Sequence, residues 1–279
     1  MLSPFQQIKE NLHVIMPDAK LELIPKKWEK IGDILIIKLD NRILAYKTEI
    51  GKTYAAFLNC KSVLIDSGGI KGVYREPELT FIYGNKDTRT IHHENGIDYK
   101  LDPQYVMFSS GNIDERIRMS TIECAGEVII DLFAGIGYFI LPLAVYGKPS
   151  KIYACEINPI SFTFLKENII LNNVDSIVTA LFGDCRKTAP RNVADRVIMG
   201  YFHDTEKFLN TALDCLKRKC GIIQYHDTFP DKKIPNVPLK IIGKAAERFD
   251  RKVTLLKYYK VKSYAPGISH YVFDVRIDK

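Results

Sequence analysis

The sequence predicts an α/β fold, in which a doubly wound parallel sheet follows a smaller α+β domain. From about residue 124 onward, apolar runs typical of buried strands alternate with segments of helical periodicity, as in a parallel sheet with crossover helices. Before about residue 100 the apolar runs are shorter, and turn residues separate them. We therefore predict an α+β domain over residues 1–100 and a doubly wound domain over residues 101–279.

The first domain contains two clear strand patterns and one helix pattern. "DILIIKL" (33–39) and "SVLIDS" (62–67) are rich in β-branched and aliphatic residues and predict strands. "TEIGKTYAAFL" (48–58) predicts a helix between them. "SGG" (67–69) and "GNKD" (84–87) predict turns.

The second domain reads as five strands with helices between them. The strands are expected within "EVIIDLFA" (127–134), "KIYACEI" (151–157), "IVTALFGD" (177–184), "DRVIMGY" (195–201) and "CGIIQYHD" (220–227). Helices are expected after Gly137, at 158–173 and at 205–219. The stretch 253–277 predicts two further strands around a Pro-Gly turn, which would form an antiparallel edge.

Composition narrows the class of protein. No stretch approaches the roughly 20 uninterrupted apolar residues of a membrane span, and no secretion signal is visible. The six cysteines form no C-x-x-C pair and have no histidine at zinc-ligand spacing, so we expect reduced thiols, no metal and a cytoplasmic location. No obligatory protein partner is evident.

The net charge of +7 permits a nucleic-acid partner without establishing one. Basic residues recur in "PKKWEK", "CLKRKC" and "RFDRKVTLLKYYKVK". Such runs are commonly solvated faces, and they are also what a phosphate backbone requires.

The segment "IIDLFAGIGYF" predicts a ligand-binding turn at the carboxyl end of the first strand of the doubly wound sheet. Gly135 and Gly137 let the backbone approach a ligand closely, and the helix that follows offers its N-terminus. A dinucleotide fingerprint would need a third glycine at residue 140, where Ile140 stands. The pattern D-x-F-A-G-x-G, with Asp131 and Phe133, instead resembles motif I of class I S-adenosylmethionine-dependent enzymes.

Two further acids follow at strand ends. Glu156 ends the second strand, where an acid can accept both ribose hydroxyls of a bound nucleoside. Asp184 ends the third strand, where such folds place an acid against the adenine amino group, with the backbone of Cys185 beside it. Taken singly, an exposed strand-end glutamate or a helix-capping aspartate would explain each residue. Their correct order after the glycine turn favours S-adenosylmethionine binding.

Longer segments of the chain point to a particular family among the S-adenosylmethionine-dependent enzymes. Residues 84–120 and "DLFAGIGYFILPLA", "NPISFTFLKENIILNN" and "YAPGISHYVFDV" resemble the archaeal and eukaryotic enzymes that modify purine 37 beside the tRNA anticodon. One branch is the tRNA (guanine-37-N1)-methyltransferases. The other is the tRNA wybutosine-synthesising protein 2 family, the tRNA(Phe) 4-demethylwyosine aminocarboxypropyltransferases. The resemblance runs from about residue 28 to the end of the chain.

The loop after the fourth strand favours the second branch. The methyltransferases typically have Asn-Leu-Pro or Asn-Pro-Pro there, whereas this chain has Met199-Gly200-Tyr201. The resemblance implies transfer of the 3-amino-3-carboxypropyl group of S-adenosylmethionine to carbon-7 of 4-demethylwyosine at position 37 of tRNA(Phe). It also implies that the base is extruded from the anticodon loop into the site. By charge and by analogy, we expect the N-terminal domain (1–100) and the basic face near Arg248–Lys262 to contact the tRNA. The alternative within the family is a guanine-37 or wyosine methyltransferase.

The resemblance also implies roles for particular residues. Ser109 and Arg116 correspond to residues that contact the methionine end of the cofactor, and Arg116 would pair with its carboxylate. Relatives often have Asn at the position of Cys185 and Trp at the position of Ser269. If Cys185 contributes through its backbone N–H, the first departure is harmless.

Proton removal from carbon-7 follows the attack and is driven by the aromatic product, so a strong base is not required. Tyr201 and His203 are the candidate catalytic residues, with Asp204 on the same loop, and a hydrogen-bonded core histidine is expected at His226. Outside this family, a non-catalytic RNA-binding protein and a small-molecule methyltransferase remain as alternatives. The intact acids and glycines argue against the first, and tRNA binding would argue against the second.

Overall fold

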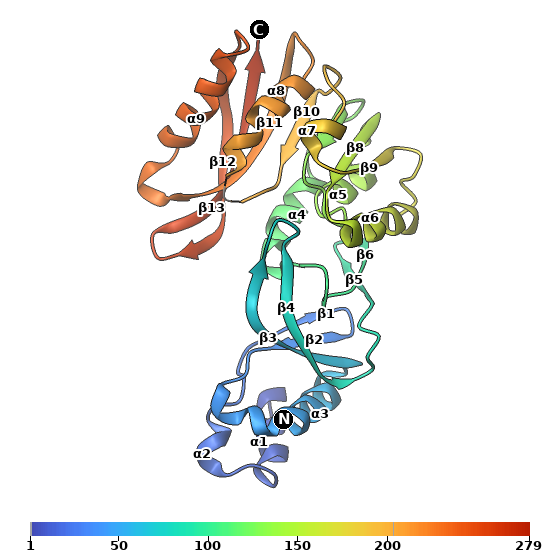
Figure 1. The fold of residues 1–279 in the computed structure, drawn as a ribbon, viewed down its shortest axis with the longest axis vertical. Helices are drawn as coiled ribbons and strands as arrows, with labels where there is room; N and C mark the ends of the chain where they lie inside the picture. Colours follow the sequence, from blue (N-terminus) through green and yellow to red (C-terminus); the bar gives the residue numbers. More distant parts are fainter. Residues whose placement is uncertain (1, 203) are drawn as a thin grey trace. The chain divides into compact units, whose positions relative to one another are not determined.

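The computed structural model describes residues 2–202 and 204–279. The chain forms two compact units, which divide between Ser110 and Gly111 (Figure 1). No helix of the described residues is long and apolar enough to cross a membrane.

The N-terminal unit combines helices with a four-stranded sheet of order β1-β2-β3-β4. Strands β2 and β3 are parallel and are connected through α3, whereas the two outer pairs are antiparallel. A separate two-stranded ribbon, β5-β6, follows. The elements are α1 (Pro4–His13), α2 (Asp18–Leu21), β1 (Trp28–Ile31), β2 (Ile34–Ile37), η1 (Asn41–Tyr46), α3 (Lys47–Leu58), β3 (Ser62–Lys71), β4 (Glu76–Gly84), β5 (Thr90–Glu94) and β6 (Ile97–Leu101).

Local signals explain where these helices begin and end. Ser3 and Gln6 form a reciprocal capping box at the start of α1, with Pro4 in its first turn. Helix α3 ends at Asn59, which adopts a left-handed conformation with φ of 49°. Tyr54 on α3 is fully buried, and its hydroxyl donates to the Pro25 carbonyl at 2.5 Å.

The turn predicted at 67–69 is wrong, because strand β3 continues through it to Lys71. The sheet tolerates these residues through an irregularity in the pairing with β4 between Asp66 and Ile70. Gly69 has φ of 79° inside it, a conformation that glycine adopts without strain.

The C-terminal unit is built on a seven-stranded sheet of order β12-β13-β11-β10-β7-β8-β9. Strands β9, β8, β7, β10 and β11 are parallel, and β13 runs antiparallel between β11 and β12. The elements are η2 (Ser110–Asn112), α4 (Ile113–Ser120), β7 (Val128–Asp131), α5 (Ile140–Tyr146), β8 (Lys151–Glu156), α6 (Pro159–Leu171), β9 (Val178–Phe182), α7 (Cys185–Thr188), β10 (Arg196–Met199), η3 (Thr205–Phe208), α8 (Leu209–Cys215), β11 (Cys220–Pro230), η4 (Asp231–Lys233), α9 (Asn236–Glu247), β12 (Lys252–Ala265) and β13 (Ile268–Asp278).

This topology confirms the predicted doubly wound sheet. The predicted strand pair at the C-terminus exists, but its second strand inserts beside β11 and leaves β12 as the edge. Helices α8 and α9 cover one face, where Leu213 and Ile242 share a core with strand residues such as Val197 and Phe273 (Figure 1). The strand order reverses at β7 and β10, so a ligand is expected beyond their carboxyl ends.

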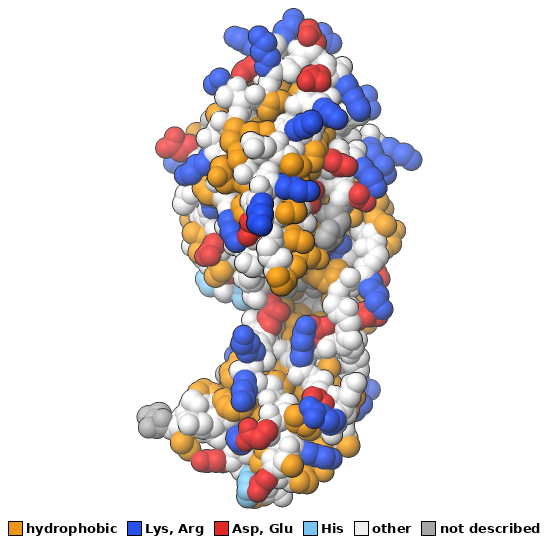
Figure 2. Space-filling view, turned by 90° about the vertical axis from the view of Figure 1, so that its left-hand side faces the viewer, with side chains coloured by type: hydrophobic (Ala, Val, Ile, Leu, Met, Phe, Trp, Pro, Cys, Tyr) orange, Lys and Arg blue, Asp and Glu red, His pale blue; other side chains and the backbone are white. Residues whose placement is uncertain are grey.

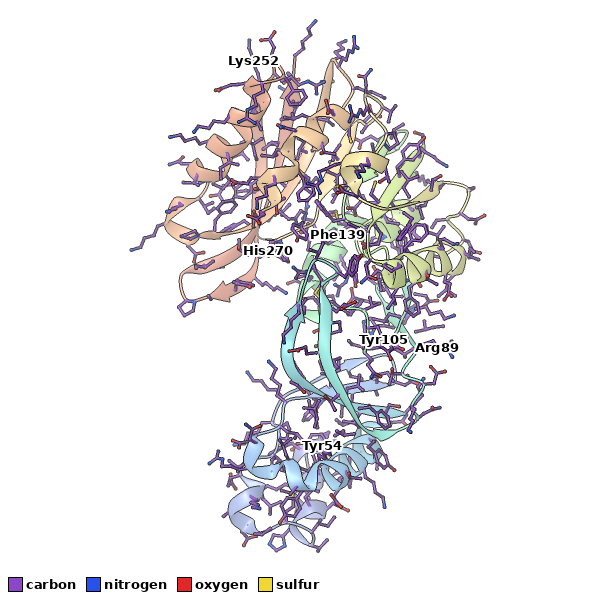
Figure 3. The ribbon with its side chains drawn as sticks, in the orientation of Figure 1. Tyr54, Arg89, Tyr105, Phe139, Lys252 and His270 are labelled. Atoms are coloured by element: carbon purple, nitrogen blue, oxygen red, sulfur yellow. The ribbon has the colours of Figure 1, made fainter. Side chains whose placement is uncertain are left out.

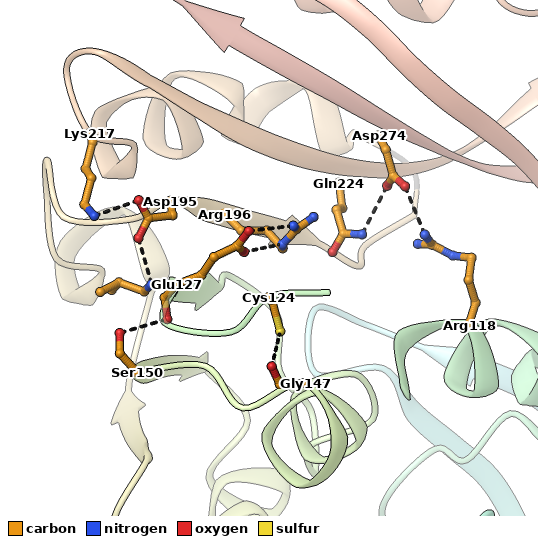
Figure 4. A network of polar contacts seen from close by, with 11 residues as sticks. Arg118, Cys124, Glu127, Gly147, Ser150, Asp195, Arg196, Lys217, Gln224 and Asp274 are labelled. Carbon is orange, nitrogen blue, oxygen red and sulfur yellow. Dashed lines mark hydrogen bonds and ion pairs between the residues drawn. The ribbon is translucent and has the colours of Figure 1, made fainter. Parts of the chain in front are cut away.

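Polar side chains fix the opposite, amino end of the same two strands (Figure 4). The Arg196 guanidinium donates two hydrogen bonds to the Glu127 carboxylate, at 2.8 and 2.9 Å. Asp195 accepts from the Val128 backbone N–H at 2.8 Å and from Lys217 at 2.7 Å. These contacts hold β7 and β10 in register, and therefore keep the loops at their carboxyl ends together.

Candidate functional site

The turn after β7 has the geometry that its glycines predict. Gly135 and Gly137 have φ of 58° and 104°. A Cβ atom at Gly135 would lie 2.4 Å from the Tyr138 ring, and one at Gly137 would lie 2.8 Å from Leu141. Because both φ values are positive and a side chain at either position would collide with a neighbour, the turn requires glycine at both.

Glu156 connects this turn to the next one. Its Oε2 accepts from the Gly135 N–H at 2.7 Å, and its Oε1 accepts from the Asn158 N–H at 2.6 Å. Burial raises the pKa of Glu156 despite these backbone hydrogen bonds. A carboxylate oxygen has more than one lone-pair site, so the two oxygens can still accept hydroxyl groups from a ligand.

Asp131 lies at the end of β7 and is almost completely buried, with 1% of its surface exposed. Its Oδ1 accepts from the Phe133 N–H at 2.9 Å, and its Oδ2 has no hydrogen-bond partner among the described residues. Burial raises the pKa of Asp131 to about 7. An unsatisfied buried carboxylate oxygen beside the glycine turn fits a ligand that carries positive charge or a hydroxyl group there.

The Asp131 carboxyl should make the unfolding free energy depend on pH. Its folded pKa lies above its unfolded value, so its contribution favours the folded state below about pH 4 and is lost as the pH rises toward 7. We expect the ligand-free Asp131→Asn variant to lack a decrease of about 3 kcal/mol that the wild type shows between pH 5 and pH 8. Urea unfolding at both pH values measures this difference. Equal pH dependence in both proteins would contradict it.

Asp184 has the capping position that its place after β9 predicts. Its Oδ1 accepts from the Arg186 N–H at 3.0 Å, and the Arg186 guanidinium also bonds to both carboxylate oxygens. The hydrogen bonds from Arg186 lower the pKa of Asp184. The Cys185 side chain is buried in the core with its pKa raised by burial, so only the Cys185 backbone can face a ligand.

Arg116 and Ser109 belong to different units. Arg116 lies on α4 with 2% of its surface exposed, which rules out an ordinary surface arginine. Ser109 is half-buried near the end of the N-terminal unit.

The loop after β10 carries an aromatic wall close to the glycine turn. The Tyr201 ring stacks on the Phe133 ring with centroids 4.9 Å apart, and Phe208 packs edge-on against Phe133 at 4.9 Å. The Thr205 hydroxyl donates to the Tyr201 carbonyl at 2.9 Å. His203, the other predicted catalytic residue, lies outside the described residues.

Sequence reasoning missed two asparagines that shape the site. Asn158 caps α6 by accepting from the Ile160 and Ser161 N–H groups. The buried Asn168 side chain donates to the Ile136 carbonyl at 3.0 Å and so holds the glycine turn from the outside. The Asn-Pro pair at 158–159 is a recognisable capping signal. Asn168, in contrast, lies within an apolar helical pattern, and nothing in that pattern indicates its contact with the turn.

The site therefore joins a glycine turn, three acids at consecutive strand ends and an aromatic wall. Its acids can accept hydroxyl and amino hydrogens, and its turn admits a close backbone contact. This combination suits a nucleoside with a positively charged substituent.

Comparisons with known proteins agree with this description. Residues 90–255 match the TRM5/TYW2 methyltransferase domain, and residues 8–88 match the TYW2 N-terminal domain. The tRNA(Phe) (4-demethylwyosine(37)-C(7)) aminocarboxypropyltransferase of Pyrococcus horikoshii is 41% identical, over 98% of this chain and 97% of that protein. The Methanocaldococcus jannaschii protein of the same name is 40% identical, over 91% of this chain and 98% of that protein.

Solved structures of TYW2 and Trm5 proteins are also similar to this chain. P. horikoshii TYW2 in complex with MeSAdo has a TM-score of 0.89 and 39% identity, covering 99% of both chains. M. jannaschii TYW2 in complex with AdoMet has a TM-score of 0.74 and 38% identity, covering 91% of this chain and all of that one. The complex of aTrm5 with tRNALeu has a TM-score of 0.84 and 28% identity, covering all of this chain and 80% of that one. The resemblance and the class I fold predicted from the sequence are thus confirmed, and the chain belongs to the TRM5/TYW2 family.

Proposed function

We propose that this protein transfers the 3-amino-3-carboxypropyl group of S-adenosylmethionine to carbon-7 of 4-demethylwyosine at position 37 of tRNA(Phe). The observation that carries the proposal is the nearly full-length similarity to two aminocarboxypropyltransferases, at 41% and 40% identity. The site supports it independently, because the turn at 131–137 and the carboxylate of Glu156 suit a nucleoside cofactor.

Each acid of the site has a proposed contact with the cofactor. The Glu156 carboxylate accepts the ribose hydroxyls, while the turn with Asp131, Phe133, Gly135 and Gly137 surrounds the nucleoside and its positive centre. Asp184 and the Cys185 backbone receive the adenine. Because Arg186 already occupies both Asp184 oxygens, the adenine contact at Asp184 is shared with that ion pair.

The amino-acid end of the cofactor is assigned to Arg116 and Ser109. A guanidinium can bind the carboxylate of this arm with two parallel hydrogen bonds, which fixes direction as well as position. The burial of Arg116, at 2% exposure, supports this role because its side chain is held inside the protein and not free in solvent.

When bound, S-adenosylmethionine supplies a sulfonium that activates the carbon-γ of this arm toward a nucleophile. In the net reaction the bond between sulfur and carbon-γ breaks, carbon-7 of the base bonds to carbon-γ, and carbon-7 loses its proton. 5′-Methylthioadenosine leaves. The chain's own residues orient the reactants, with Tyr201 and Phe133 as the aromatic wall and Tyr201 and His203 as the proposed proton-accepting or orienting groups.

Labelled S-adenosylmethionine tests the proposal directly. With tRNA(Phe) that carries 4-demethylwyosine, label in the carboxyl carbon should enter the tRNA, and label in the methyl carbon should not. Mass spectrometry of the nucleosides should show the gain of the four-carbon amino-acid arm. Methyl label in the tRNA would establish the methyltransferase alternative instead.

The anticodon loop of tRNA(Phe) is the proposed partner, and strand β12 is a proposed contact surface. Its exposed side chains include Lys252, Lys257 and Lys260, with Tyr258 and Tyr264 about half exposed between and beside them. Figure 2 shows Lys and Arg side chains spread over this side of the C-terminal unit. Lysines attract phosphates, and exposed aromatic rings stack on unpaired bases. A cytoplasmic location, which suits the six free thiols, is part of the proposal.

A Lys252→Ala/Lys257→Ala variant should bind tRNA more weakly and with less salt dependence. Each lost phosphate contact should reduce the slope of log affinity against log salt by about 0.7 to 0.9. Filter binding between 50 and 200 mM salt measures this slope. Lys166→Ala is the matched control, since Lys166 is also exposed and lies on α6, which packs on β8 and β9 at the opposite edge of the sheet from β12. An unchanged slope in the double variant would remove β12 from the interface.

A further inference from the structure

Behind the loop that follows β10 lies a group of four rings that the proposed mechanism does not use. We call Phe139, Phe202, His226 and His270 the ring cluster. They come from the turn before α5, from the loop itself, from β11 and from β13. Figure 3 labels Phe139 and His270 at one end of the sheet of the C-terminal unit.

The pairing of the strands places the cluster at the level of the loop. Met199, the last residue of β10, is paired with Tyr225 on β11, so His226 lies one residue further along, level with Gly200. His270 on β13 is paired with Thr228 on β11. Both histidines therefore lie at the carboxyl end of β10, where the loop begins.

The four rings are in continuous contact. Phe139 stacks on His226 with centroids 5.1 Å apart and an angle of 24° between the planes. His226 Nδ1 and His270 Nε2 are 3.3 Å apart and share a hydrogen bond. Phe202 packs on His270 at 4.4 Å with an angle of 76°.

The loop backbone closes against this cluster. A Cβ atom at Gly200 would lie 2.7 Å from Cε2 of Phe139, so the ring occupies the space that a side chain would need. Tyr201 stacks on Phe133, outside the cluster, and Phe202 packs on His270. Each of the three residues 200–202 is therefore held by a different ring.

The two histidines are buried, and their imidazole rings are uncharged at neutral pH. His226 and His270 are 0% and 1% exposed, and burial lowers the pKa of both, that of His270 to about 3. As neutral rings they can form their hydrogen bond with one N–H and one lone pair. His226 Nε2 also lies 3.6 Å from Oε1 of Glu115, which precedes Arg116 on α4.

We propose that the ring cluster is a positioning device that fixes the backbone of residues 200–202. The loop contains no proline, so its rigidity has to come from packing rather than from a restricted φ. His226 and His270 act through Phe139 and Phe202 and touch no reactant themselves. The link between loop position and group transfer rests on the proposed function, whereas the effect of the cluster on the loop does not.

The test compares His270→Ala with His270→Phe. Hydrogen exchange of the amides of residues 200–202, measured without cofactor or tRNA, should be about three- to tenfold faster in His270→Ala, because a ring contact of this kind is lost. The kcat for group transfer should fall by about tenfold or more, while KM for S-adenosylmethionine changes by less than about threefold. His270→Phe keeps a ring against Phe202 and should restore most of both losses.

Tyr146→Ala is the control, since Tyr146 is a half-exposed ring at the far end of α5. If His270→Ala does not fold, Phe202→Ala removes the same contact from the loop side and takes its place. Unchanged amide exchange in the alanine variants would overturn the proposal, as would a His270→Phe variant as impaired as His270→Ala. Because the exchange is measured without substrate, transfer of a methyl group by the wild type would refute the proposed function while leaving this inference standing.

Discussion

Glu156→Gln should weaken S-adenosylmethionine binding by about 100-fold, although it changes a single oxygen to an NH₂ group. Both carboxylate oxygens accept backbone N–H groups, from Gly135 at 2.7 Å and from Asn158 at 2.6 Å. A carboxamide has one oxygen, so its NH₂ would face one of these N–H donors. Losing one such bond destabilises the free and the bound protein alike. The affinity falls because the ribose hydroxyls lose an acceptor, and one hydrogen bond to a charged group contributes about 1.5 to 3 kcal/mol.

Isothermal titration calorimetry with S-adenosylmethionine measures this effect, and thermal unfolding reports any loss of stability. Glu123→Gln is the matched control, because Glu123 is exposed and lies before β7, away from the carboxyl ends of the strands. We expect the control to bind like the wild type. Wild-type affinity in Glu156→Gln would show that the carboxylate contacts neither the turn nor the cofactor in solution.

The positions of the site acids could be predicted from the sequence because each depends on local pattern. A buried strand followed by a glycine turn locates Asp131, and the next two strand ends locate Glu156 and Asp184 in the same way. Parallel strands bring their carboxyl ends to one edge, so local assignments become a shared site without knowledge of long-range contacts.

The sequence patterns did not predict helices α1 and α9, although α1 has a clear local signal. Helix α1 begins with Ser3, Pro4 and Gln6, a recognisable capping box, in a segment whose mixed composition conceals the helical period. Helix α9 also went unpredicted. It begins after Pro235 without a side-chain cap, so its start has no comparable signal.

The contacts that hold the site in place could not be predicted, because they join residues far apart in the chain. His226 and His270 are ordinary strand residues in the sequence, and only the insertion of β13 beside β11 makes them neighbours. The same insertion brings Asp274 to Arg118, 156 residues away. A single sequence carries no signal for such pairs.

Arg118→Met should reduce the unfolding free energy by about 3 to 5 kcal/mol, because it leaves a buried carboxylate without its partner. The Arg118 guanidinium donates to both oxygens of Glu115, at 2.8 and 2.7 Å. It also donates to Asp274 at 3.0 Å (Figure 4). Burial already raises the pKa of Glu115, and Gln224 donates to Asp274 at 3.1 Å from the neighbouring strand. The arginine thus joins α4 to β13, and Asp274 in turn is bonded to β11 through Gln224.

Urea unfolding of four proteins separates charge pairing from packing. Arg42→Met breaks an exposed pair with Asp40 and should cost less than about 1 kcal/mol. The Arg118→Met/Glu115→Gln double variant removes one of the two carboxylates left without the arginine, while Asp274 remains, and should recover about half of the loss. A single Arg118→Met variant as stable as the wild type would contradict the assignment. Helix α4 also carries Arg116, so the position of Arg116 depends on how firmly α4 is held. The destabilised Arg118→Met variant should therefore bind S-adenosylmethionine more weakly. The double variant should regain affinity in proportion to its recovered stability.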